Sequence, residues 1–108
     1  MRTIMLTVAA CVALSPMTAF AEPARMDNQT FIRATACAAY GSLPALAADG
    51  VDVSAIVERV NTEHARKDRD IQKRAAREVR TALMAAHQGA SADELRERRD
   101  RYCASFLA

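Results

Sequence analysis

The sequence contains no tryptophan and only three phenylalanines and two tyrosines among its 108 residues. A hydrophobic core must therefore be built mainly from aliphatic side chains, with alanine filling the space between them. A chain of this length is enough for one domain, which buries only a modest share of its surface on folding. The expected core residues are Phe31, Ile32, Leu43, Leu46, Val53, Ile56, Val60, Ile71, Val79, Leu83, Leu95, Tyr102 and Phe106.

The sequence also lacks a recognisable catalytic or metal-binding motif. His64 and His87 are the only candidate bases, and no second histidine follows His64 at the four-residue spacing of a zinc protease. Neither histidine has ligand-type spacing to a cysteine, the serines lie in no nucleophile elbow, and no calcium loop is present. We therefore predict that the protein is not an enzyme and needs no cofactor or metal.

A strong net charge is absent as well, since 15 basic residues face 13 acidic ones. Residues 1–21, which we expect to be removed, contain Arg2 and no acid, so 14 bases and 13 acids remain. A nucleic-acid-binding domain would carry a clear basic excess on one face. Nucleic acid is therefore not an expected partner.

The first 21 residues have the features of a secretory signal peptide. Arg2 is followed by an apolar run from Ile4 to Leu14, a break at Ser15-Pro16 and the small-x-small pattern of Ala19-Phe20-Ala21. The apolar run is shorter than the roughly 20 residues that span a bilayer. We predict cleavage near Ala21, a single helical domain over residues 22–108, and a periplasmic or secreted location.

The cysteines allow one disulfide and one alternative anchor. Cys11 follows Val8-Ala9-Ala10, which loosely fits the box before a lipidated cysteine, so a lipid-anchored envelope protein is an alternative. Without Cys11, only Cys37 and Cys103 remain, and an oxidising compartment favours a bond between them. Closing a loop of this length stabilises a protein by about 4 kcal/mol in the chain-entropy model.

Apolar residues at three- and four-residue steps predict an all-α fold, a small up-down bundle of three main helices. These helices are expected at about 28–40, 53–88 and 92–106, with a short helical turn at 43–48. Asp27 is the expected N-cap of the first helix and Gly41 its expected left-handed end. Ser91 and Glu94 form an expected capping box for the last helix.

The segment 53–88 contains neither glycine nor proline, and Gly89 follows it. One continuous helix there would measure about 54 Å, whereas a compact domain of this size is only about 25–30 Å across. The middle, residues 61–70, is almost entirely polar. We therefore expect a bend or break in that stretch; the alternative is a protruding helix that forms a homodimer.

A charged belt along this segment is the candidate partner-binding face. Its seven bases are Arg66, Lys67, Arg69, Lys73, Arg74, Arg77 and Arg80, and four acids interrupt them: Glu63, Asp68, Asp70 and Glu78. The acids make membrane contact less favoured than binding to another envelope protein. We predict an exported protein that acts by protein–protein binding, such as an inhibitor, an immunity protein or an accessory subunit. The alternative is a small disulfide-bonded periplasmic stress chaperone.

Overall fold

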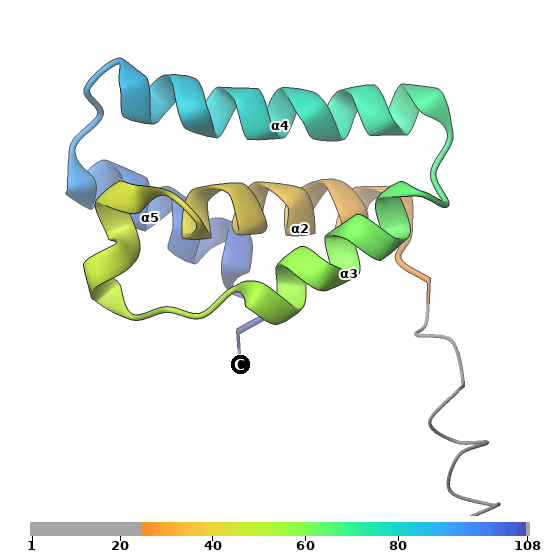
Figure 1. Ribbon diagram of the computed structural model, residues 1–108, viewed down its shortest axis with the longest axis horizontal. Coiled ribbons are helices and arrows are strands. Elements are labelled where there is room, and N and C mark those ends of the chain that lie inside the picture. Colours follow the sequence, from red (N-terminus) through yellow and green to blue (C-terminus); the bar gives the residue numbers. More distant parts are fainter. Residues whose placement is uncertain (1–24, 108) are drawn as a thin grey trace, which may run out of the picture.

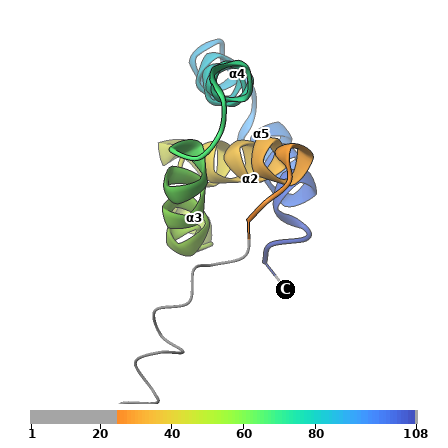
Figure 2. The same cartoon turned by 90° about the vertical axis from the view of Figure 1, so that its right-hand side faces the viewer.

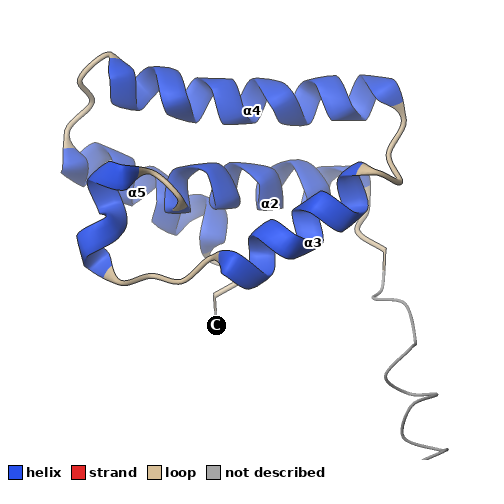
Figure 3. Ribbon diagram, viewed as in Figure 1, coloured by secondary structure: helices blue, strands red, loops and turns tan. Residues whose placement is uncertain are grey.

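The computed structural model describes residues 25–107, and every regular element in that range is helical (Figures 1 and 3). The α-helices are α2 (Asn28–Gly41), α3 (Ser54–His64), α4 (Arg69–His87) and α5 (Ala92–Cys103), and the 3-10 helix η1 (Pro44–Asp49) joins α2 to α3. The all-α fold class is confirmed. The predicted signal peptide, its cleavage near Ala21 and the possible lipidation at Cys11 lie outside the described residues.

Helix α2 is the centre of the bundle, because α3, α4 and α5 all pack against it. In Figure 2, which shows α4 end-on, α4 lies on one side of α2, and α3 and α5 flank α2 on the side away from α4. In contrast, α4 makes few contacts with either α3 or α5. Helix α4 is therefore supported along one face only, and hollows remain on both of its flanks. Within residues 25–107, no helix is both long enough and apolar enough to cross a bilayer.

The core contains most of the expected apolar residues, and alanine fills much of the rest. Eight of the predicted core side chains are buried: Phe31, Leu43, Leu46, Val53, Ile56, Val60, Ile71 and Leu95. Ile32, Tyr102 and Phe106 are half-buried against it. The predicted burial of Val79 and Leu83 is wrong, because these side chains are 38% and 56% exposed. Small residues take the contact positions of α4 on α2 instead, with Ala75 and Ala82 fully enclosed.

The break expected within residues 61–70 is confirmed, so the predicted helix at 53–88 is two helices. Helix α3 ends at His64 and α4 begins at Arg69. Asp68 starts α4 as its N-cap, with a side-chain oxygen that accepts the Ile71 N–H at 3.0 Å. The break needs no glycine or proline, because an aspartate that satisfies the first free N–H groups can begin a new helix.

The other helix starts follow the sequence closely. Asp27 accepts the Thr30 N–H at 2.7 Å, and Ser91 accepts the Glu94 N–H at 3.1 Å, so both predicted N-caps are confirmed. The Glu94 side chain does not complete the capping box; it pairs with Arg98 at 2.8 Å. Helix α5 ends at Cys103, three residues before the predicted end at 106.

Gly41 does not occupy the predicted left-handed position. Among the described residues only Gly50 and Gly89 have positive φ, and Gly41 is the last residue of α2. Its role is close packing, because a Cβ at Gly41 would lie 2.6 Å from Cγ1 of Val53. The segment that enters α3 therefore crosses directly over the end of α2.

The predicted disulfide is confirmed and joins α2 to the end of α5. Cys37 and Cys103 have Cα atoms 4.9 Å apart, and both residues are fully buried. Close by, the rings of Tyr40 and Tyr102 stack with their centroids 5.8 Å apart. This bond and this ring pair hold the C-terminal helix on α2.

Candidate partner-binding surface

The seven bases of the predicted face divide into two groups in the structure. Arg66 and Lys67 lie in the turn between α3 and α4, whereas Arg69, Lys73, Arg74, Arg77 and Arg80 lie on α4. The two groups have different surroundings, and only the second is available to a partner along its length.

The bases of the turn are engaged within the protein. The carboxylate of Glu63 accepts the Met26 N–H at 3.3 Å and pairs with Arg66 at 3.1 Å. Lys67 donates a hydrogen bond to the Met26 carbonyl and lies 5.7 Å from the centroid of the Phe31 ring. This corner clasps the chain just before α2, so Arg66 and Lys67 have a structural role.

The environment of Glu63 also fixes its ionisation. Burial raises the pKa of its carboxyl, but the hydrogen bond from the Met26 N–H and the nearby Arg66 outweigh burial and hold the pKa below its ordinary value. Glu63 is therefore a buried, ionised carboxylate that is removed from the outer surface. It cannot offset the charge of the bases on α4.

Four of the α4 bases form a continuous strip, which we call the basic ridge: Arg69, Lys73, Arg77 and Arg80. At 100° per residue they fall within a sector of about 80°, opposite the buried Ala75 and Ala82. Arg74 lies beside this strip, on the flank that faces α5. The ridge therefore runs along the outward face of α4.

The acids that interrupt the belt in sequence do not lie on the ridge. Glu63 is buried in the corner, Asp68 caps the start of α4, and Glu78 is half-buried on the side nearer α2. Only Asp70, in the first turn of α4, borders the ridge. The folded protein thus separates bases from acids that alternate in the sequence.

The bases of the ridge differ from the arginines of α5 in whether they form ion pairs. On α5, Arg96, Arg98 and Arg99 each form an ion pair with an acid at 2.7–2.9 Å. Within residues 25–107, no acid lies within ion-pair distance of any of the four ridge bases. Their guanidinium and ammonium groups are therefore open to a ligand from outside.

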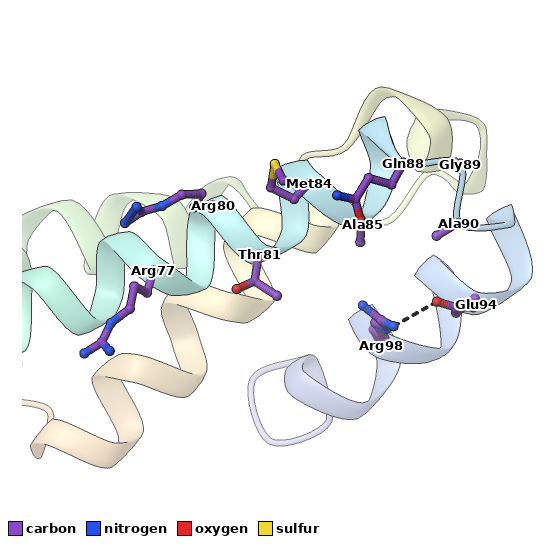
Figure 4. Close-up of a pocket in the computed structure, with 10 residues that line it drawn as sticks. All are labelled: Arg77, Arg80, Thr81, Met84, Ala85, Gln88, Gly89, Ala90, Glu94 and Arg98. Atoms are coloured by element: carbon purple, nitrogen blue, oxygen red, sulfur yellow. Dashed lines mark hydrogen bonds and ion pairs between the residues drawn. The ribbon is translucent and has the colours of Figure 1, made fainter.

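An open cleft of about 710 Å³ lies along the α5 side of α4 (Figure 4). Arg77 and Arg80 stand at its α4 edge, and Arg98 stands on α5, where it pairs with Glu94. Thr81, Met84, Ala85, Gln88, Gly89 and Ala90 make up the rest of its lining. The lining thus contains three arginines and one acid, Glu94, which is paired with Arg98, so the unpaired bases at the α4 edge can receive carboxylates.

A second charged cluster is structural. Asp49 at the end of η1 accepts hydrogen bonds from Arg96 at 2.8 Å and from Arg99 at 2.7 Å. These bonds lower the pKa of Asp49 to about 2. Arg99 is buried, so Asp49 neutralises a charge inside the protein and ties η1 to α5.

The histidines lie apart from these features. His64 ends α3, where its ring centroid is 6.4 Å from that of Phe31, and His87 ends α4. Across residues 25–107, no three side chains of the types that bind metals are grouped closely enough to hold an ion. Comparison with protein-family models, curated proteins and solved structures finds no match to the chain.

Three apolar residues beside the ridge are exposed, and two of them, Val79 and Leu83, were predicted to be buried. Val79, Leu83 and Met84 are 38%, 56% and 47% exposed. Val79 and Leu83 are four residues apart, a step that core residues of a helix also show, so the sequence pattern alone cannot distinguish buried from exposed positions. They lie on the two flanks of α4, where α3 and α5 leave it uncovered.

Proposed function

We propose that the protein is an exported helical binding protein that uses the basic ridge of α4 to bind an acidic protein of the cell envelope. The role is that of an inhibitor, an immunity protein or an accessory subunit. The observation that carries this proposal is the row of four bases without an acid partner on a helix that is supported along one face only.

Such a row destabilises the isolated protein. Neighbouring like charges at three- and four-residue steps cost about 0.2–0.5 kcal/mol per pair, and the ridge contains three such pairs. The penalty is about 1 kcal/mol, which is a noticeable fraction of the stability of a small domain. Carboxylates of a partner would remove it and form charge-assisted hydrogen bonds with the three arginines. The arrangement therefore favours the bound state over the free state.

Lys73 allows a direct test, because it is the only lysine of the ridge. A carbodiimide joins an amine to a carboxylate in direct contact with it. We expect the purified oxidised protein, mixed with an envelope extract, to form an adduct that joins Lys73 to an aspartate or glutamate of one partner. The variant Lys73→Arg keeps the charge but loses the amine, so it should form no adduct.

Two matched variants separate the ridge from general charge. Arg77→Glu/Arg80→Glu and Arg25→Glu/Arg33→Glu each lower the net charge by the same amount, but only the first changes the ridge. The first should abolish the Lys73 adduct and the second should retain it. An adduct that survives the ridge variant, or the absence of any adduct at Lys73, would contradict the proposal.

A stress chaperone is the second candidate, favoured by the exposed Leu83 and Met84. A chaperone holds unfolded clients through apolar surface, so charge reversal on the ridge would leave its activity unchanged. Light scattering of an aggregating model client at pH 2–4, with the native protein and with Arg77→Glu/Arg80→Glu, distinguishes the two candidates.

A further inference from the structure

An apolar groove runs along the flank of α4 that faces α3. Val57 and Val60 of α3 form one wall and Val79 and Leu83 of α4 form the other. Ala38 and Ala39 of α2, with Leu43 and Pro44, lie at its floor and end. The groove exists because α3 and α4 both pack on α2 but hardly contact one another.

The chemistry of the groove restricts what it can hold. Its polar groups are Thr35, Ser42 and Asn61, and the Thr35 hydroxyl already donates to the Phe31 carbonyl at 2.8 Å. Its volume of about 280 Å³ lies just below the roughly 300–1,000 Å³ of pockets that enclose drug-sized molecules. It therefore suits one or two large aliphatic side chains and has little to orient a polar metabolite.

We propose that this groove receives aliphatic side chains of the acidic partner segment whose carboxylates contact the basic ridge. This inference rests on the function proposed above and names the chemistry of the partner. The ridge and the groove share a border on α4, where Arg80 lies next to Val79 and one turn before Leu83. A partner segment with carboxylates and leucine-like side chains on adjoining faces would contact both at once.

Charge complementarity argues against the other occupants. A symmetric dimer through this side of α4 would bring the same basic surface of each copy together, and like charges in an interface are repulsive. A membrane surface is also a poor match. Apolar residues of a surface-bound helix must face the lipid, whereas Val79 and Leu83 line a hollow walled by α3.

Site-specific photo-crosslinking in the producing cells tests the inference. A diazirine amino acid is placed at position 83 in the groove or at position 77 on the ridge, in the full chain. We expect both positions to label the same protein. Mass spectrometry should place the position-83 label on an aliphatic residue within a segment that contains aspartate or glutamate.

A groove-filling variant supplies the control. Ser42 is exposed at the rim, so Ser42→Leu fills the groove without changing the core. It should reduce labelling from position 83 by about fivefold or more, whereas Ser105→Leu, at an exposed serine outside the groove, should leave it unchanged.

The outcomes separate the two proposals. Labelling of a protein from position 77 alone, or equal labelling with Ser42→Leu, overturns the groove inference and leaves the proposed function standing. Labelling of lipid or of a second copy from position 83 overturns the named occupant. If neither position labels another protein, both proposals fail.

Discussion

The carboxylate of Glu63, at the end of α3, accepts a hydrogen bond of 3.3 Å from the backbone N–H of Met26, 37 positions earlier in the chain. From the same corner, Lys67 donates to the Met26 carbonyl. Both backbone polar groups of Met26 are thus satisfied by the turn between α3 and α4. A buried backbone group without such a partner would be costly, so this contact favours the break over a continuous helix.

Removing the charge of Glu63 should loosen this corner. Glu63→Gln keeps a hydrogen-bond acceptor but loses the charge-assisted bonds to Met26 and Arg66. We expect the melting temperature to fall by roughly 5 °C, measured by circular dichroism at pH 7. Glu97→Gln, an exposed glutamate of α5, is the control and should change it by much less. Equal effects of the two variants would show that the charge of Glu63 does not stabilise the protein through this corner.

Reducing the disulfide should lower stability strongly. The bond joins residues 66 positions apart, so its loss frees a long loop in the unfolded chain. Cys37→Ala/Cys103→Ala should reduce the free energy of unfolding by about 2–5 kcal/mol in urea denaturation. An unchanged midpoint after treatment of the native protein with dithiothreitol would disprove this role.

A methyl group at Gly41 should be destabilising, because its Cβ would lie 2.6 Å from the buried Val53 side chain. We expect Gly41→Ala to reduce the free energy of unfolding by about 1–3 kcal/mol. The double variant Gly41→Ala/Val53→Ala removes the clash, so its loss should be smaller than the sum of the two single losses. If the losses of the two single variants are additive, residue 41 and Val53 are not in tight contact.

Acid should weaken the protein through Asp49 and Glu63. Both carboxyls have a pKa in the folded protein that is below the ordinary value, about 2 in the case of Asp49. A lowered folded pKa stabilises the protein above the unfolded pKa, and this stabilisation is lost as the pH falls through the folded pKa. The stabilisation by Asp49 is therefore lost as the pH falls from about 4 to about 2.

Melting temperatures recorded between pH 7 and pH 2 check this expectation. Asp49→Asn should lower the melting temperature at pH 7 and flatten its decline below pH 4. Glu97→Gln, at an exposed glutamate of α5, is the control for loss of one carboxylate. If the melting temperature of both variants falls with pH as steeply as that of the native protein, Asp49 does not control the loss of stability in acid.

One substitution on the ridge should separate stability from binding. Lys73→Glu replaces two like-charge neighbours by opposite-charge pairs with Arg69 and Arg77. We expect the free energy of unfolding to rise by about 0.5–1 kcal/mol, while partner binding is lost. Arg25→Glu should change neither, since it lies outside the helix. A Lys73→Glu variant that is more stable and still binds its partner would remove the ridge from the interface.

Much of the local structure could be predicted from the sequence. Asp27 and Ser91 mark helix starts because their side chains reach only the next turn, and the Cys37–Cys103 bond follows from having two cysteines outside the expected signal peptide. The break within residues 61–70 followed from length alone. The clasp on Met26 that accompanies the break could not be predicted from the sequence, because it joins residues far apart in the chain.

The surface, by contrast, depends on how the helices pack. Val79 and Leu83 have the spacing of core residues, and they are exposed only because α3 turns away from α4 at the break. Bases and acids alternate in the sequence between Glu63 and Arg80. In the structure they lie on different faces of α4, and Glu63 is buried, so the ridge carries bases only. The sequence determines the helical turn on which a side chain lies. Which residues surround that turn depends on how α3, α4 and α5 pack on α2.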